Sequence, residues 1–205
     1  YSRQIGLPAG REVPIVGGGR LTGRAGRFTL GLVNIQTGEE PTASALGTNF
    51  TVARLKRNVL RRSSIGAIVT HRSALAGGPG PNQTVGVDAT FAFYDNVNFN
   101  GYYARTETST QDGVFDRNND SYQTAFTYNG DLYALGVDHL LVGENFNPEV
   151  GFLRRTDFRR TFVQSQFSPR PASLALVRQF KFGGSFDYIE TVAGQVESRI
   201  ARSSF

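Results

Sequence analysis

The sequence contains no cysteine, no methionine and no tryptophan, and its 205 residues include only two lysines and two histidines. Without cysteine, the chain has no disulfide framework, no cysteine-based zinc site and no thiol catalysis. His71 and His139 are far apart and lack carboxylates at ligand spacing, so the sequence predicts neither a metal site nor a catalytic histidine. Because the chain opens on Tyr1 and has no methionine, we expect a leader or further domains to precede it.

Long hydrophobic runs are also absent. No stretch of about 18 apolar residues occurs, so the sequence contains no candidate transmembrane helix. Amphipathic runs of helix-forming residues are missing too, whereas glycine (24 residues) and phenylalanine (16 residues) are abundant. This composition favours strands joined by turns over helices. It leaves a transmembrane β-barrel open, since barrel strands show only about ten-residue segments of alternating polarity.

The basic charge is almost entirely arginine, and the formal net charge is +5. A basic balance can indicate nucleic acid or an anionic surface as partner. Because the arginines are spread over the whole chain, we interpret them as solvated positions and predict no nucleic-acid partner. The three glycines at 17–19 do not fit a dinucleotide fingerprint, since Thr22 stands where the third glycine would fall. No phosphate-binding loop motif is present either.

The 17 acidic residues include no segment that indicates a catalytic pair. A glycosidase needs two carboxylates roughly 5 to 10 Å apart, which the sequence does not place together. The sequence therefore predicts that the protein is not an enzyme and uses no cofactor. A glycoside hydrolase has the least support among the functional hypotheses.

Alternation of apolar and polar residues, interrupted by turn signals, predicts a chain made of strands. The clearest case is the run 85–93, whose odd-numbered residues are all apolar. Turn signals at 24–26, 95–96 and 129–130 indicate antiparallel hairpins. The predicted strands cover residues 13–23, 27–37, 46–58, 63–73, 85–93, 97–108, 121–129, 132–142, 152–164, 174–188 and 191–203.

Two features favour a membrane barrel over a soluble β-sandwich. The predicted strands exceed the usual five or six residues and can cross a bilayer at a tilt. Their non-apolar positions are often Gly, Ser, Thr, Ala or Asn, whereas soluble sheet surfaces carry more lysine. We therefore predict an all-β, antiparallel, up-and-down transmembrane β-barrel, complete or truncated, with residues 1–205 as one domain of about 11–12 strands. Single-chain bacterial barrels have even strand numbers, so eleven strands would indicate truncation or a miscounted segment.

Some polar and aromatic side chains are expected at the membrane–water interface. Arg178 falls on the apolar side of the run 174–188, where its long side chain would need to reach water. His139 lies on an apolar strand face and is also interpreted as interfacial. Tyrosines near strand ends suit interfacial girdles. They are Tyr94, Tyr102, Tyr128, Tyr133 and Tyr188.

Several short segments occur in the order found in one bacterial family. They are 1–6 (YSRQIG), 17–26 (GGGRLTGRAG), 32–37 (LVNIQT), 48–55 (TNFTVARL), 64–68 (SIGAI), 85–89 (VGVDA) and 146–155 (FNPEVGFLRR). On these segments, most of residues 1–155 resembles a family of bacterial outer-membrane β-barrels of uncharacterised function. Its members carry an N-terminal domain similar to family-9 carbohydrate-binding modules, which this chain lacks. The resemblance implies an outer-membrane location and a link to glycan handling, and it supplies no catalytic residues.

Five charged residues are predicted to line the barrel interior. They are Arg54, Arg72, Asp88, Arg105 and Glu107. Each alternates with apolar or small residues, and rings of such charges tune passage through pores. We expect a channel or membrane anchor in the bacterial outer membrane, with the lipid bilayer and small solutes or glycans as partners. The alternative is a soluble β-sandwich that binds carbohydrate through Tyr and Phe stacking platforms.

Overall fold

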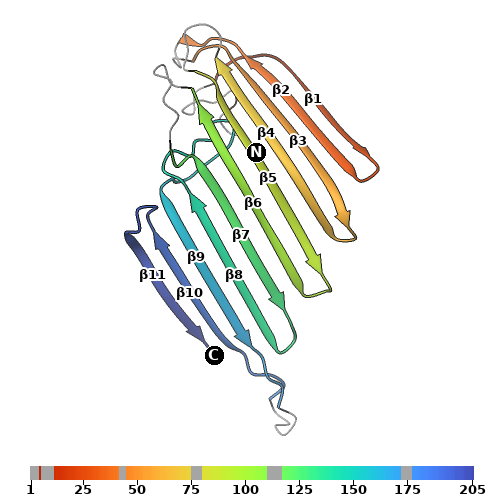
Figure 1. The fold of residues 1–205 in the computed structure, drawn as a ribbon, viewed down its shortest axis with the longest axis vertical. Helices are drawn as coiled ribbons and strands as arrows, with labels where there is room; N and C mark the ends of the chain where they lie inside the picture. Colours follow the sequence, from red (N-terminus) through yellow and green to blue (C-terminus); the bar gives the residue numbers. More distant parts are fainter. Residues whose placement is uncertain (1–4, 6–11, 42–44, 75–79, 110–116, 172–176) are drawn as a thin grey trace.

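The computed structural model describes residues 5, 12–41, 45–74, 80–109, 117–171 and 177–205. Over these residues the chain forms eleven β-strands in one antiparallel sheet, and their spatial order is their order in the sequence (Figure 1). The strands are β1 (Ile15–Ala25), β2 (Phe28–Thr37), β3 (Thr48–Leu60), β4 (Ser63–Ala74), β5 (Asn82–Phe93), β6 (Val97–Thr108), β7 (Asp120–Asn129), β8 (Tyr133–Val142), β9 (Phe158–Phe167), β10 (Phe182–Glu190) and β11 (Val196–Ser204).

This architecture confirms the prediction of an all-β, antiparallel, up-and-down chain. Among the described residues, β1 pairs only with β2 and β11 pairs only with β10, so the sheet is open. The two edge strands run in the same direction, because ten reversals separate them (Figure 1). The described sheet therefore does not close into a barrel.

Tight hairpins follow the turn signals in the sequence. Gly26 adopts a φ of 56° between β1 and β2, a left-handed conformation that glycine reaches without steric cost. Tyr94 adopts a φ of 55° in the turn between β5 and β6. The turn between β7 and β8 is closed by a hydrogen bond that the Gly130 nitrogen donates to the Tyr133 carbonyl oxygen at 2.9 Å. These three hairpins confirm the predicted turns.

Three strand boundaries near the C-terminal end were predicted wrongly. The strand predicted at 191–203 is β11, which starts only at Val196 because residues 191–195 form a turn in which Gly194 has a φ of 88°. The strand predicted at 152–164 is β9, which starts later because the chain first turns at Pro148 and passes through Asp157 with a φ of 56°. The strand predicted at 174–188 is β10, and residues 174–176 lie outside the described part of the chain. Arg178 precedes β10 and is exposed. Its predicted place on an apolar strand face is therefore wrong.

The strands are staggered along the sheet. One row of paired residues begins at Phe28, the first residue of β2, and passes from strand to strand to Arg199 of β11. Arg199 lies six residues before Phe205, the last residue. Because these rows run perpendicular to antiparallel strands, the hairpin end of the sheet forms the staircase visible in Figure 1. Strands that tilt within a barrel wall are staggered in this way.

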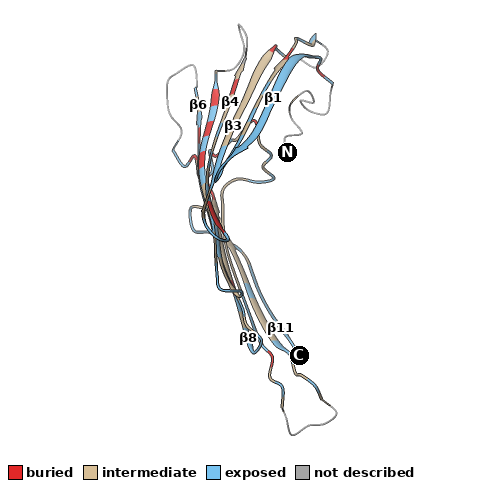
Figure 2. Cartoon of the chain, turned by 90° about the vertical axis from the view of Figure 1, so that its right-hand side faces the viewer, coloured by how far each residue is buried: buried red, intermediate tan, exposed pale blue. Residues whose placement is uncertain are grey.

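The described chain is one layer thick over most of its length (Figure 2). Its accessible surface is 13645 Å², whereas a compact protein of 22.4 kDa exposes about 9,400 Å². The excess, roughly 4,200 Å², arises because no second sheet covers either face in the described residues. No helix in this part of the chain is long and apolar enough to span a membrane.

The best-buried side chains gather at one end of the sheet, around the ends of β5 to β8. The connection from β8 to β9 folds back there, and its Phe146 and Val150 are buried together with Val142. Asn82 and Thr106 of the sheet beside it have exposed fractions of 0% and 1%. The core is therefore local and partly polar, and it does not extend along the sheet.

Candidate functional site

The strand registers sort the residues onto two faces. Successive strand residues point to opposite faces, and residues paired across strands share a face. On what we call the polar face, one row consists of Lys56, Gly66, Asp88, Tyr102, Gln123, Leu140, Arg160, Ile189 and Ser198. On the opposite, apolar face, the adjacent row consists of Leu30, Leu55, Ala67, Val87, Tyr103, Tyr122 and Leu141.

The apolar face is uncovered. Seventeen exposed large hydrophobic side chains at regularly paired strand positions of the described residues lie on it, whereas Tyr102, Ile200 and, through its pairing with Thr37, Ile15 lie on the polar face. Soluble monomers rarely expose a contiguous apolar patch above a few hundred Å², and larger patches mark contact surfaces. The seventeen are Leu21, Phe28, Leu30, Leu32, Leu55, Ile65, Val69, Val85, Val87, Phe93, Phe99, Tyr103, Tyr133, Leu135, Phe167, Phe182 and Phe186.

A polar rim borders the apolar face at the end of the sheet opposite the tight hairpins. From β2 to β6 the rim residues belong to a single row of paired residues. From β6 to β11 the rim residues lie progressively nearer to the hairpin end of their strands. The row consists of Asn34, Thr51, His71, Gln83 and Glu107. The continuation consists of Arg105, Asp120, Arg159, Glu190 and Arg199.

Several rim side chains bind one another or a neighbouring residue of the same face, here Asn49 and Tyr103. Asn34 Nδ2 donates hydrogen bonds to Asn49 Oδ1 at 3.0 Å and to Thr51 Oγ1 at 2.7 Å. The Tyr103 hydroxyl donates to Asp120 Oδ1 at 2.7 Å. On the last strands, Arg159 Nη1 lies 3.1 Å from Glu190 Oε1. The rim is thus a hydrogen-bonded polar border rather than a set of isolated charges.

The rim runs obliquely to the hydrogen-bonded rows. On β2 the rim residue Asn34 lies six residues beyond Phe28, whereas on β11 the rim residue Arg199 lies in the row of Phe28 itself. Six residues rise about 20 Å, and the nine strand spacings between β2 and β11 span about 43 Å. The rim is therefore inclined by about 25° to the hydrogen-bonded rows. If the strands leaned by that angle from a common axis, all rim residues would lie at the same height along that axis.

Aromatic rings collect on the apolar face at the hairpin end. Tyr133 stacks on Phe167 with ring centroids 5.1 Å apart, and Phe167 stacks on Phe182 at 6.2 Å. At the same end, the guanidinium of Arg57 lies 5.2 Å above the ring of Phe28, which shields this charge on an apolar surface. The apolar face is thus bordered by polar groups at one end and by aromatic groups at the other.

The five predicted girdle tyrosines separate in the structure. Tyr128, Tyr133 and Tyr188 lie on the apolar face. Tyr102 lies on the polar face, and Tyr94 occupies a turn. His139 lies on the apolar face, as its alternation predicts.

Charged residues on the polar face pair across the strands. Arg54 of β3 forms an ion pair with Asp88 of β5, and the two side chains meet over Gly66 of β4. A Cβ atom at position 66 would lie 2.8 Å from the nearest atom of each partner. Glycine at this position therefore allows the ion pair to cross the intervening strand.

Further along the polar face, two more polar contacts continue this pattern. Arg160 Nε and Nη2 each donate to one carboxylate oxygen of Asp187 at 2.8 Å. Gln123 Nε2 donates to Asp138 Oδ2 at 2.6 Å. With the Arg54–Asp88 pair, these contacts form a polar belt from β3 to β10.

The polar face is basic overall. Its strand positions in the described residues carry seven basic and three acidic side chains. The basic ones are Arg20, Arg24, Arg54, Lys56, Arg72, Arg160 and Arg202, and the acidic ones are Asp88, Asp138 and Asp187. The face therefore presents an excess of positive charge to whatever lies against it.

The five residues predicted to line one interior do not share a face. Arg54, Arg72 and Asp88 lie on the polar face, and the structure brings Arg54 and Asp88 into contact. Arg105 and Glu107 lie on the apolar face, in its polar rim, because Arg105 pairs with Val85. The five therefore divide between the two faces, because their strands pair in a register that sequence alternation does not specify. Which of them line an interior stays a prediction.

Sequence reasoning missed Glu149, which lies in the connection after β8 and forms an ion pair with Arg72. The turn signal at Pro148 predicted a loop but could not show which strands the loop would reach. Asn82 and Asn147, whose hydrogen bond ties the loop to β5, were missed for the same reason.

A hollow of about 640 Å³ lies near the middle of the apolar face. It surrounds Gly101, which leaves a gap between Phe99 and Tyr103 on the same strand face. A Cβ atom at Gly101 would lie 2.7 Å from the backbone oxygen of Gln123. The absence of a side chain at Gly101 therefore allows β6 and β7 to approach closely and leaves the space of the hollow on the apolar face.

The described residues hold no group of three or more side chains suited to a metal ion. The chain matches no family profile, no curated protein and no solved structure. The resemblance to an outer-membrane barrel family therefore stays a prediction.

Proposed function

We propose that this chain is a wall of a bacterial outer-membrane β-barrel, with the apolar face toward lipid and the polar face toward a water-filled interior. One observation carries the proposal: within the part of the chain that the structure describes, no second layer covers the apolar face, which is bordered by a polar rim and by aromatic rings. Barrels of this class have an apolar outer band flanked by aromatic girdles and a polar interior.

The dimensions of the apolar band support this orientation. On β5 the band runs from Val85 to Phe93, which is about 27 Å along the strand. With strands tilted by about 40°, that length spans about 20 Å across the membrane, near the roughly 25 Å of a barrel's outer band. The oblique rim indicates a smaller tilt of about 25°, at which the same band spans about 24 Å across the membrane.

The basic polar face supports a role in solute passage. The Arg54–Asp88, Arg72–Glu149 and Arg160–Asp187 pairs are internally neutral, and the remaining excess of arginine and lysine favours anions over cations. Charged side chains that line a pore set such selectivity. The chain thus acts as a channel wall for small anionic or polar solutes, glycans among them, and no bond chemistry is assigned to it.

A soluble carbohydrate-binding β-sandwich has less support. A sandwich buries the apolar faces of two sheets against each other, whereas the described residues form one sheet with that face open. Aromatic platforms on the apolar face would be lost to the core of such a sandwich.

Closure of the barrel is subject to a parity rule. Because β1 and β11 run in the same direction, their direct pairing would create one parallel pair in an otherwise antiparallel ring. An antiparallel ring needs an odd number of additional strands between them. Unpaired edges are not tolerated in lipid, since each unsatisfied backbone group costs several kcal/mol.

Detergent dependence tests the proposal. The chain, together with the additional strands that close the ring, is refolded in plain buffer and in micelles of a mild detergent, and each sample is run on a gel with and without boiling. We expect aggregation in buffer, and in detergent a folded species whose migration changes on boiling. A monodisperse monomer that unfolds cooperatively in plain buffer would contradict the proposal and favour a soluble fold.

A further inference from the structure

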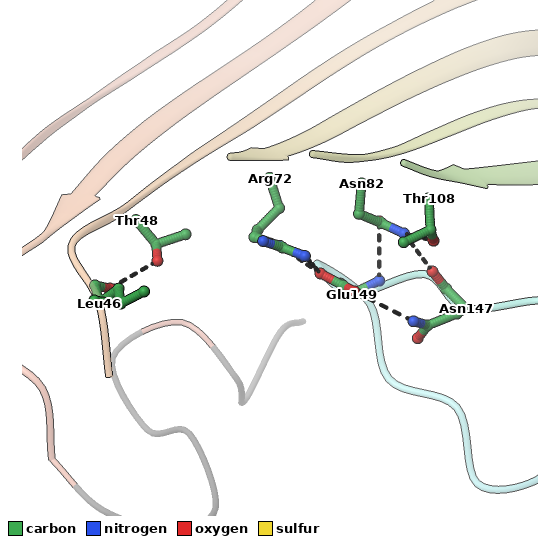
Figure 3. A network of polar contacts seen from close by, with 7 residues as sticks. All are labelled: Leu46, Thr48, Arg72, Asn82, Thr108, Asn147 and Glu149. Carbon is green, nitrogen blue, oxygen red and sulfur yellow. Dashed lines mark hydrogen bonds and ion pairs between the residues drawn. The ribbon is translucent and has the colours of Figure 1, made fainter. Parts of the chain in front are cut away.

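The connection between β8 and β9, residues 143–157, lies over the polar face. The backbone nitrogen of Asn147 donates a hydrogen bond to Thr106 Oγ1 of β6 at 3.0 Å. Asn82 Nδ2 of β5 donates to the Asn147 carbonyl oxygen at 3.0 Å, and Glu149 pairs with Arg72 of β4 (Figure 3). Since β7 separates β8 from these strands, the loop reaches back across the sheet to three strands that are not its neighbours.

The loop is seated by burial as well as by hydrogen bonds. Phe146 and Val150 are buried, and the Asn145 nitrogen donates to the Asn118 carbonyl oxygen at 3.1 Å. The Arg72 side chain is 8% exposed, and Glu149 is its partner from the loop. Removing one member of a buried ion pair leaves the other charge poorly solvated, so the Arg72–Glu149 pair holds the loop strongly in place.

We propose that residues 143–157 form a constriction inside the barrel, locked by the Arg72–Glu149 pair, which limits the size of the solute that passes. This inference rests on the proposed function, because it takes the polar face as the interior. A loop that extended beyond the strand ends would leave the interior open. A loop fastened to β4, β5 and β6 instead occupies part of the cross-section at that end.

A matched pair of variants separates the effect of losing the Arg72–Glu149 ion pair from the effect of removing one negative charge from the loop. Glu149→Gln removes the charge that pairs with Arg72 and keeps the side-chain size. Glu144→Gln makes the same change at an exposed position of the same loop. Limited trypsin digestion in detergent micelles, with peptide mapping, measures cleavage after Arg154 and Arg155. We expect cleavage about tenfold faster in Glu149→Gln, since local opening becomes easier, and unchanged in Glu144→Gln.

Liposome swelling with uncharged sugars of increasing size then tests the constriction. We expect Glu149→Gln to admit large sugars at least about threefold faster than the wild type, and Glu144→Gln to match the wild type. Faster cleavage with identical size limits would overturn the constriction alone. Equal cleavage of both variants would overturn the lock. If the wild type itself admits no sugar, the proposed function fails and the constriction fails with it.

Discussion

Replacement of Val87 by arginine places a charge in the middle of the apolar face. Val87 is 54% exposed on β5 and lies four residues from the rim residue Gln83, about 13 Å along the strand. If this face meets lipid, an arginine near the bilayer midplane destabilises the fold by about 2–4 kcal/mol. That corresponds to a roughly 30- to 900-fold change in the folding equilibrium.

Thr90 on the same strand provides the control. It is exposed and lies on the polar face, where it pairs with Ser64. Thr90→Arg should change the free energy of unfolding by no more than about 0.5 kcal/mol, as usual for solvated surface positions. The two positions lie on opposite faces and about 10 Å apart along the strand, and both fall within the span of the apolar band from Val85 to Phe93. Their difference therefore reports mainly on the surroundings of the apolar face.

The assay is urea unfolding in lipid vesicles, followed by tyrosine fluorescence and by gel migration. Reversibility is checked by approaching each urea concentration from the folded and the unfolded state. If Val87→Arg and Thr90→Arg cost the same, the apolar face does not meet acyl chains. The assignment of the two faces would then be refuted.

Two further tests address local features of the sheet, a pair of glycine substitutions and a double-mutant cycle. Gly101→Ala should lower the free energy of unfolding by about 1–3 kcal/mol, because its Cβ would meet the Gln123 backbone oxygen at 2.7 Å. Gly19→Ala is the control: with nothing within 4 Å of its Cβ, it should leave stability unchanged or raise it by up to about 1 kcal/mol. Equal unfolding midpoints of the two variants would contradict this reasoning. In a double-mutant cycle, the effects of Arg54→Gln and Asp88→Asn on the free energy of unfolding should show a coupling of about 0.2–1 kcal/mol, since both partners are partly exposed. Additive effects would mean that the ion pair does not contribute to stability.

Strand periodicity was readable from the sequence because it is a local property. The run 85–93 alternates at a period of two, and the structure places all of its odd-numbered residues on one face. The hairpin turns were equally local, since Gly26 permits a left-handed backbone whatever its surroundings. Boundaries failed where the chain turns before a strand, as it does between Pro148 and Asp157.

The amino-acid sequence by itself determined that the chain is all-β, that its strands are long and that each has one apolar side. Only the tertiary structure decided which sides coincide. Asp88 and Arg105 both alternate with apolar neighbours, yet the pairing of Val85 with Arg105 sends them to opposite faces. The ion pair between Glu149 and Arg72 likewise depends on the tertiary structure, which brings the connection after β8 to β4. The physical reason is that register and loop docking depend on contacts between residues far apart in the chain, whereas alternation depends on the backbone geometry of each strand alone.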